Sequence, residues 1–410
     1  MNILFVCHRF PFPPTRGGKI RPFQMIRHLS QSHSVTVASL AHTQKELEEG
    51  AGLKQHCPDV IAEVLPSSVR WKNAFAALPT RNPSSAAYFW SPRLHDRIQR
   101  AARNRKFHAV IVHCAFVARY VEDIRCDFRL LDYGDLDSGK WLEYSMQRAL
   151  PFSAGYKLEA RKLRKYEKAL ASQFDHCTFT ARGELEEFLS WELNAPASLI
   201  PNGVDADYFQ PLAERPPQAS TVVFLGRMDY FPNTEGIIDF SQNVFPRIRS
   251  EFPAARLRII GSNPVREVRE LSTKPGIEVT GSVPDVRPYL ADAAVAVAPL
   301  NIARGTQNKI LECMSMGIPV VSSPQAARGV QATPGEHLLV GKDHSDFAAQ
   351  VIKLLCDSEL RSRVAQSARQ QLRNGHSWAR SMQLLDAVLA CGTFKPAYTD
   401  QKALPAVQLS

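Results

Sequence analysis

The sequence of 410 residues contains no apolar run that approaches the ~20 residues a helix needs to cross a bilayer, so no transmembrane segment is expected. Its opening residues, MNILFVCH, lack a basic stretch before the apolar run and predict a strand, not a signal peptide. Its eight cysteines are scattered without a C-x-x-C pair, which argues against a disulfide framework or a zinc site. These absences predict a cytoplasmic protein with reduced thiols.

The sequence also lacks the motifs of two binding classes. The dinucleotide fingerprint G-x-G-x-x-G does not follow the first predicted strand. No nucleic-acid motif accompanies the net charge of +10, so nucleic acid is not expected as a partner. Residues 1–200 hold 28 basic and 20 acidic residues, or +8, whereas residues 201–410 hold 22 and 20, or +2. The first half is therefore expected to face an anionic membrane surface or a phosphate-bearing acceptor.

What the sequence does contain is a repeated alternation of short apolar runs and amphipathic segments. This alternation favours parallel sheets with right-handed crossovers, and the length suits two or three domains. The expected strands are residues 2–7, 35–40, 109–114, 130–133 and 177–180 (the last of the first half), then 221–225, 257–260, 277–280, 294–298 and 320–321. The expected helices are residues 22–30, 156–171, 182–189, 309–316, 345–356, 360–373 and 377–389, with another from about 234. We therefore expect an α/β protein with two doubly wound units.

The boundary between these units is marked by turn residues and prolines. PNGVD at residues 201–205 is a turn signal because Asn-Gly supplies positive φ, and the proline-rich segment after it loses periodicity. The expected division is a first domain at 1–205, a linker at 206–220, a second domain at 221–375, a C-terminal helix at 376–392 that packs back toward the first domain, and a disordered tail at 393–410.

The stretch ARGTQNKILECMSMGIPVVSS, residues 303–323, is expected to hold the chemistry. A polar loop at 304–308 leads into a helix that ends at Gly317, and a helix N-terminus preceded by such a loop favours an anion. A cation in the first turn, Lys309, is unfavourable there unless an anion binds. We interpret Lys309 as a phosphate ligand and Glu312 as an acceptor for a sugar or ribose diol. A surface lysine followed by a helical glutamate has the same spacing.

Other features allow two interpretations each. Gly17-Gly18 permits close approach of the backbone to a ligand, or forms a flexible loop. His113, at the carboxyl end of a predicted strand, lies over a ligand crevice or serves a structural role. Asp135-x-Asp137 resembles a metal-binding D-x-D or is an ordinary acidic loop. The basic helix expected at 156–171 could lie on a membrane or present a solvated face.

Several motifs in a constant order carry a family resemblance. They are Gly17-Gly18, PNGVD at 201–205, Gly226-Arg227, GSVPD at 281–285 with Tyr289-Leu290-Ala291, Glu312-Cys313-Met314 and Gly317-Ile318-Pro319-Val320. Over about residues 1–390 the chain thereby resembles the retaining glycosyltransferases of family 4, which have the GT-B fold of two Rossmann-like domains facing a cleft. The resemblance implies transfer of a sugar from a nucleotide-diphosphate sugar to a hydroxyl of a glycan or lipid-linked acceptor, with no cofactor and no metal.

The same resemblance implies roles for individual residues. The implied catalytic residues are His113, Arg227, Lys309 and Glu312, of which Arg227 and Lys309 would stabilise the charge of the leaving diphosphate. The implied donor-binding residues are Gly17, Gly18, Arg227, Asn233, Gly261, Ser282, Val283, Arg304, Gly305, Thr306, Gln307, Asn308, Lys309 and Glu312.

The sequence departs from the family pattern at two positions. Arg304 stands where the family usually has the first of two glutamates, and Asn233 where it usually has a second diphosphate-binding lysine. Arg-Gly-x-Gln-Asn-Lys-x-Leu-Glu at 304–312 resembles a subgroup of hexosyltransferases linked to exosortase and exopolysaccharide clusters, which implies peripheral contact with the inner face of the cytoplasmic membrane. A nucleotide-sugar epimerase on the same fold and a non-catalytic binding protein on a decayed transferase scaffold remain alternatives.

Overall fold

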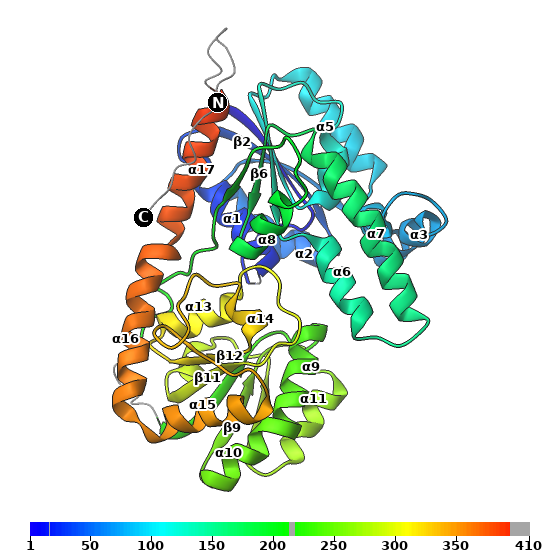
Figure 1. The fold of residues 1–410 in the computed structure, drawn as a ribbon. Helices are drawn as coiled ribbons and strands as arrows, with labels where there is room; N and C mark the ends of the chain where they lie inside the picture. The colour runs from blue at the N-terminus through cyan, green and yellow to red at the C-terminus, as the bar shows by residue number, and fades with distance from the viewer. Residues whose placement is uncertain (16, 213–217, 394–410) are drawn as a thin grey trace.

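The computed structural model describes residues 1–15, 17–212 and 218–393, which form two α/β units, one above the other in Figure 1. Each unit is built on a parallel sheet with helices packed against it. Among the described helices, none has both the length and the apolar character needed to cross a membrane.

The first sheet has the strand order β3-β2-β1-β4-β5-β6-β7. Its strands are β1 (Asn2–Cys7), β2 (Ser34–Ala41), β3 (Asp59–Val64), β4 (Ala109–His113), β5 (Phe128–Gly134), β6 (His176–Phe179) and β7 (Ala197–Leu199). The prediction that the strand at 177–180 is the last of this half was wrong, because β7 follows it. Both edge strands, β3 and β7, escaped prediction because they are largely half-buried and so lack a continuous apolar run.

The second sheet has the order β10-β9-β8-β11-β12-β13. Its strands are β8 (Gln218–Leu225), β9 (Arg256–Ile260), β10 (Ile277–Gly281), β11 (Ala293–Ala298), β12 (Val320–Ser322) and β13 (Leu339–Val340). All five strands expected from the sequence are present. The edge strand β13, with two residues, is too short to leave a periodic signal.

The helices alternate with the strands in both units. Those of the first unit are α1 (Gly17–Leu29), α2 (Gln44–Glu49), α3 (Ser67–Ala77), α4 (Ser84–Tyr88), α5 (Pro92–Asn104), α6 (Asp137–Met146), α7 (Phe152–Ala171) and α8 (Arg182–Leu189), with 3₁₀ turns at Gly50–Gln55 and Ala115–Val121. Those that follow are α9 (Phe231–Asp239), α10 (Phe245–Glu251), α11 (Arg266–Glu270), α12 (Arg287–Leu290), α13 (Asn308–Ser315), α14 (Pro324–Ala327), α15 (His344–Cys356), α16 (Ser358–Gly375) and α17 (Trp378–Thr393), with a π turn at Phe240–Val244 and a 3₁₀ turn at Leu271–Thr273.

The first strand shows why the central strands are continuously apolar. Leu4 and Val6 pack into a core cluster on one face of the sheet, whereas Ile3 and Phe5 pack into the cluster on the other face. Since successive side chains of a strand point to opposite faces, a strand covered on both sides needs apolar residues at every position. The apolar run at the start of the chain therefore predicts a central strand.

The C-terminal helices join the two units. α16 packs against α13 in the second unit, and α17 then returns to the first unit, where Trp378, Met382 and Leu385 enter its core (Figure 1). The turn at residues 201–205 between the units, the junction turn, is held by α17, because Ser381 Oγ donates to the carbonyl of Pro201 at 2.6 Å. Part of the expected linker, 213–217, and nearly all of the expected tail lie outside the described residues.

The carboxyl ends of the two sheets meet where the units face each other. Thr306, after β11, donates through Oγ1 to the carbonyl of Thr180, after β6, at 3.2 Å. In α6, the ring of Tyr144 lies 5.6 Å from that of Phe231 at the start of α9. Open α/β sheets bind ligands at this edge, so the functional site is expected there.

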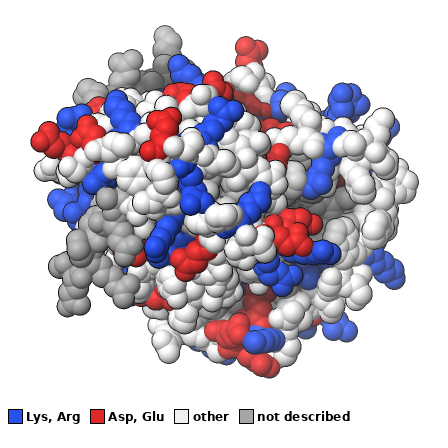
Figure 2. Space-filling model, turned by 90° about the horizontal axis from the view of Figure 1, so that it is seen from below, with Lys and Arg blue, Asp and Glu red and all other residues white. Residues whose placement is uncertain are grey.

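At the end of the molecule seen in Figure 2, basic and acidic side chains are interspersed.

Candidate functional site

The start of α13 carries a lysine in a poorly hydrated position. Lys309 Nζ donates to Asn233 Oδ1 and lies 4.8 Å from the centroid of the Phe224 ring. Burial lowers the pKa of Lys309 to about 7, although the carboxylate of Glu312 acts in the opposite direction. Burial likewise raises the pKa of Glu312 to about 7, and Lys309 opposes that shift. Both side chains therefore sit near their titration midpoints at neutral pH.

Asn233 links this lysine to the loop after β8. Its Nδ2 donates to the carbonyl of Arg227 at 2.8 Å while its Oδ1 accepts from Lys309. A Cβ on Gly226 would lie 2.7 Å from Asn233 Nδ2 and 3.3 Å from Lys309 Nζ, so the arrangement requires glycine at that position. The asparagine that departs from the family pattern thus holds the lysine of α13 in place.

Arg227, the second expected phosphate ligand, is paired in this structure. Its Nε donates to Asp229 Oδ1 at 3.0 Å, and a second, short bond joins Nη2 to Oδ2. The guanidinium is well exposed, so an incoming anion can reach it. Asp229 was not singled out in the sequence, because an aspartate two residues after an arginine has no motif of its own.

Two glycine positions have structural explanations. A Cβ on Gly261, where φ is +155°, would lie 1.6 Å from the carbonyl oxygen of Gly226, so no other residue fits. Gly17 begins α1, five residues before the expected start, and a Cβ there would lie 3.6 Å from Asn308 Nδ2. Gly17-Gly18 is therefore the first turn of a helix that approaches the start of α13, and the expected loop ends earlier than predicted.

The loop before α13 is bound to the first unit. Arg304 donates from Nε to Glu184 at 2.9 Å, from Nη1 to Glu143 at 3.1 Å and from Nη2 to Glu187. Burial would lower the pKa of Arg304, but the carboxylates of Glu184 and Glu187 raise that pKa above its ordinary value. Because each guanidinium nitrogen already has a carboxylate, the contacts do not favour the predicted role of Arg304 in binding an anionic donor. We refer to these four residues as the Arg304 cluster.

Neighbouring loop residues are held equally closely. Gly305 has φ of +63°, and a Cβ there would lie 1.9 Å from Asp135 Oδ1. Gln307 Nε2 donates to the carbonyl of Arg304 at 3.1 Å. The loop from Arg304 to Gln307 therefore has contacts that explain its residues without a donor, whereas Lys309, in the first turn of the helix that follows, contacts Asn233.

Ser282 and Val283 lie farther out on the second unit. They follow β10, which is separated from β8 by β9 in the sheet. Ser282 is exposed, and Val283 packs against the core of this unit. They share the carboxyl edge of the sheet with Arg227 but lie at its outer strand, so contact with the donor stays a prediction for both.

His113 is at the carboxyl end of β4, as expected from the sequence. In the sheet it stands beside Cys7 of β1, and its ring lies 5.8 Å from the ring of His8. Its Nδ1 is 2.7 Å from Asp132 Oδ2. The structure thus places the histidine on the face of the first unit that meets the second, and gives it an acidic partner that the sequence did not reveal.

α6 contributes a lysine, Lys140, that the sequence did not single out as a site residue. Lys140 Nζ lies 5.4 Å from the centroid of the Tyr230 ring, across the boundary between the units. Burial lowers the pKa of Lys140, but Tyr230 and Asp137 outweigh it and raise that pKa above its ordinary value. Burial raises the pKa of Asp137 to about 6, with Asp135 adding to the shift. Only the tertiary structure brings this lysine toward α9.

Asp135 and Asp137 do not gather further ligands. Asp135 Oδ1 accepts from Thr180 Oγ1 at 2.9 Å. Across the described part of the chain, no group of three or more histidine, cysteine, aspartate or glutamate side chains is arranged to hold a metal ion.

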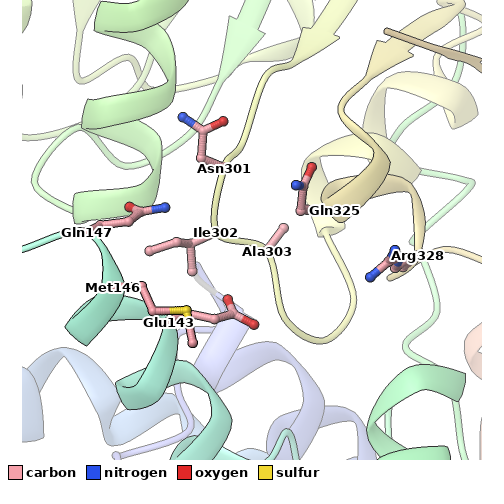
Figure 3. Close-up of a pocket in the computed structure, with 8 residues that line it drawn as sticks. All are labelled: Glu143, Met146, Gln147, Asn301, Ile302, Ala303, Gln325 and Arg328. Carbon is pink, nitrogen blue, oxygen red and sulfur yellow. The ribbon is translucent and has the colours of Figure 1, made fainter. Parts of the chain in front are cut away.

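A cavity of about 280 Å³ opens beside α6. Figure 3 shows α6 on one side of it and the loop after β11 with the α14 segment on the other. Its lining residues are Glu143, Met146, Gln147, Asn301, Ile302, Ala303, Gln325 and Arg328. Amide, carboxylate and guanidinium groups are suited to hydroxyl-rich ligands.

Comparison with known proteins agrees with this architecture. Residues 219–357, within the second unit, match the family model described as "Glycosyl transferases group 1". No curated protein sequence matches the chain.

Solved structures resemble the whole chain at low sequence identity. Sucrose-phosphate synthase from Thermosynechococcus elongatus has a TM-score of 0.70 at 16% identity, covering 95% of this chain and 100% of its own. HepE from Anabaena, in complex with UDP and glucose, has a TM-score of 0.67 at 13% identity and the same coverage. α,α-Trehalose 6-phosphate synthase from Burkholderia multivorans has a TM-score of 0.61 at 12% identity, covering 95% and 98%. These likenesses confirm the predicted α/β fold of GT-B type.

Proposed function

We propose that this chain is a glycosyltransferase that moves a sugar from a nucleotide-diphosphate sugar to a hydroxyl acceptor. The observation that carries the proposal is the group formed by Arg227, Asn233 and Lys309 at the N-terminus of α13. It lies within the domain that matches glycosyl transferases group 1 and at the carboxyl edge of a parallel sheet.

The chemistry of this group suits a diphosphate leaving group. As the bond between sugar and phosphate breaks, negative charge accumulates on the diphosphate, and the helix N-terminus, Arg227 and protonated Lys309 can stabilise it. A bound diphosphate would also favour the charged form of Lys309, which burial disfavours in the free protein. Two cations and a helix N-terminus could act without a metal, and the role of His113 is to contact the sugar.

The acceptor is proposed to be a glycan or a lipid-linked sugar that enters beside α6. The cavity lined by Glu143 and Arg328 offers hydrogen-bonding groups close to the Arg304 cluster. Retention of the anomeric configuration, a hexosyl donor and a role in exopolysaccharide assembly complete the proposal, in line with the resemblance to family 4.

Contact with an anionic membrane, at its inner face, is proposed for the surface formed by α3 and α7. Trp71, Phe75 and Leu78 are at least half exposed, and Lys162 of α7 donates to the carbonyl of Leu78 at 2.8 Å. Apolar rings beside a basic helix match the chemistry of an anionic bilayer interface. In a sedimentation assay, Phe75→Ser should reduce binding to anionic vesicles, whereas Leu189→Ser, an exposed leucine on α8, should not. Equal binding to anionic and neutral vesicles would contradict the proposal.

The transfer activity is tested by ligand-induced stabilisation and product analysis. A thermal-shift panel of UDP, GDP, ADP and their sugars should show stabilisation by one nucleotide and its sugars. UDP is the first choice, because HepE was solved with UDP and glucose. Incubation of the stabilising nucleotide-sugar with a glycan acceptor should yield a longer glycan. Epimerised donor without acceptor would indicate an epimerase, and binding without any product would indicate a non-catalytic protein.

A further inference from the structure

A buried carboxylate in the first unit is saturated with hydrogen-bond donors. Arg21 donates to both oxygens of Asp132, from Nη2 to Oδ1 at 2.7 Å and from Nε to Oδ2 at 2.9 Å. Thr178 Oγ1 donates to Oδ1 at 2.8 Å, and His113 Nδ1 lies 2.7 Å from Oδ2. A carboxylate accepts about four hydrogen bonds, so Asp132 has no acceptor site left.

The charge of Asp132 decides which nitrogen of His113 carries a proton. Burial would raise the pKa of Asp132, but the charge of Arg21 and the hydrogen bonds from His113 and Arg21 hold that pKa well below its ordinary range. An ionised carboxylate has no proton to donate. Nδ1 of His113 must therefore be the donor, and in the neutral imidazole Nε2 is then a free acceptor.

The other edge of the His113 ring is open. Nε2 makes no hydrogen bond with any residue in the described ranges. Nδ1 of the neighbouring His8 is a fully buried atom without a partner, whereas Nε2 of His113 is not fully buried. Nε2 is therefore accessible to solvent, although the side chain is only 8% exposed. An ordered ring with one accessible acceptor at the carboxyl end of β4 is suited to contact one hydroxyl of a ligand.

Arg21 connects this pair to the second unit. Its remaining nitrogen, Nη1, donates to the carbonyl of Ile200 at 2.8 Å and to Asn202 Oδ1 at 3.2 Å. Asn202 Nδ2 is in turn 3.4 Å from Asn308 Oδ1, in the first turn of α13 next to Lys309. Consecutive hydrogen bonds thus run from His113 through the junction turn to the start of α13.

We propose that Asp132 is a positioning residue that keeps His113 in the Nδ1–H tautomer, so that Nε2 accepts a hydrogen bond from a hydroxyl of the donor sugar. Arg21 keeps Asp132 ionised and ties its position to the junction turn. The part concerning the sugar rests on the proposed glycosyl transfer, whereas the tautomer is a property of the free protein. The two parts can therefore fail separately.

The tautomer is tested by NMR on the full chain labelled with ¹⁵N-histidine. Long-range ¹H–¹⁵N correlations distinguish the two tautomers, and the variant His113→Gln identifies the signals. We expect the Nδ1–H pattern for His113 in the unaltered protein and in Thr178→Val, which removes a different donor to Asp132. An Nε2–H pattern in the unaltered protein would overturn the proposal.

A second variant removes the carboxylate without leaving a buried charge. Arg21→Met combined with Asp132→Leu replaces the ion pair by apolar side chains of similar size, which proteins often tolerate. We expect His113 to shift toward the Nε2–H form that an unrestrained imidazole prefers. An unchanged tautomer in the folded double variant would show that Asp132 does not set it. If the double variant does not fold, the pattern of the unaltered protein decides the question alone.

The contact with the sugar is tested by two substitutions, each of which retains a polar group in place of only one of the two ring nitrogens. In His113→Asn the amide NH₂ can still donate to Asp132, but nothing occupies the place of Nε2. In His113→Gln the longer amide reaches the Nε2 position but no longer suits Asp132. Isothermal titration with UDP and UDP-glucose, or the pair that the panel selects, gives the gain in affinity from the sugar.

We expect His113→Asn to lose about 10-fold of that gain, His113→Gln to lose less, and neither to change the affinity for the nucleotide alone. Equal loss in both variants, or loss of nucleotide affinity, would overturn the contact with the sugar. If no nucleotide-sugar binds, the proposed glycosyl transfer fails, while the NMR result still decides the role of Asp132.

Discussion

At the scale of single residues, the most informative group is the pair of Lys309 and Glu312. Each is one turn from the other on α13, and each has a pKa moved to about 7 by burial. A lysine in such surroundings is unfavourable in the free protein, and its charged form gains most when an anion arrives. The energetic cost in the free protein and the gain on binding thus have the same physical origin.

Replacing Lys309 by alanine should therefore weaken diphosphate binding. A charge-assisted contact is worth roughly 1.5–3 kcal/mol, so Lys309→Ala should reduce affinity for the nucleoside diphosphate ~10–100-fold and affect the monophosphate less. Glu312→Gln should weaken both alike if Glu312 accepts from the ribose. Isothermal titration measures the four affinities, and Lys353→Ala on α15 is the control. If Lys309→Ala binds the diphosphate as tightly as the unaltered protein does, another residue supplies the second positive charge, and Lys140 is the next candidate.

The same pair predicts how the stability of the free protein depends on pH. Between pH 4.5 and about 7 the folded state holds the proton of Glu312 that the unfolded state has lost, so stability should fall with rising pH. Between about 7 and 10.5 the unfolded state holds the proton of Lys309 that the folded state has lost, so stability should rise. The pair thus contributes a minimum near pH 7.

Denaturant midpoints measured across this range test the minimum. Comparison with Lys309→Met should show that the variant loses the rise above pH 7, while Glu312→Gln should lose the fall below it. If the difference between the unaltered protein and Lys309→Met does not change from pH 7 to 10, the lowered pKa of Lys309 is refuted.

At the scale of secondary-structure elements, the site depends on close approach between loops and helix starts. The loop after β8 must come near the loop after β9, and the glycines at 226 and 261 permit this. A Cβ at 261 would meet the carbonyl of Gly226, and a Cβ at 226 would meet the side chains of Asn233 and Lys309, so packing sets both residue types, whatever ligand is bound. α13 then places Lys309 next to Asn233 because its first turn begins directly after a loop bound to the first unit.

Gly261→Ala should therefore destabilise the second unit. The added Cβ would overlap the carbonyl of Gly226 at 1.6 Å, and φ of +155° is unfavourable for alanine. We expect a loss of about 2–4 kcal/mol in the free energy of unfolding. Gly155→Ala is the matched control, since it lies inside α7 with nothing within 4 Å, and should gain about 0.5–1 kcal/mol. Chemical denaturation measures both, and equal stability of the two variants would contradict the packing argument.

At the scale of the whole molecule, the Arg304 cluster is the principal set of ion pairs described between the units. One guanidinium of the second unit meets three carboxylates on α6 and α8 of the first. Burial raises the pKa of Glu184 to about 7, and Asp135 adds to the shift although Arg304 opposes it. Removing the arginine would leave these carboxylates facing each other without a counter-ion.

Arg304→Met should consequently open the molecule. We expect a larger radius of gyration in small-angle X-ray scattering of the free protein, and a smaller difference when a nucleotide-sugar is added. Arg164→Met is the control, because Arg164 pairs with Glu187 within the first unit and does not bridge the two. The same radius of gyration for both variants and the unaltered protein would mean that the cluster does not hold the units together.

The α/β class and the central strands follow from the sequence alone. Apolar runs such as Asn2–Cys7 and Ala293–Ala298 form central strands because a sheet buried on both faces needs them, and Gly317 ends α13 with the expected positive φ of 75°. The edge strands β3, β7 and β13 left no such signal, since they are short or half-buried. The early start of α1 was missed because glycine is a poor helix former.

Which side chains share the site depends on the tertiary structure. The sequence indicated Lys309 and His113 as candidates, but their partners, Asn233 and Asp132, come from other elements of the chain. It also assigned Arg304 to the donor, whereas folding surrounds that residue with carboxylates of the first unit. Local patterns determine which segments become strands and helices, because those depend on neighbouring residues. The charge partners of a side chain depend on how distant segments pack, and no local pattern records that.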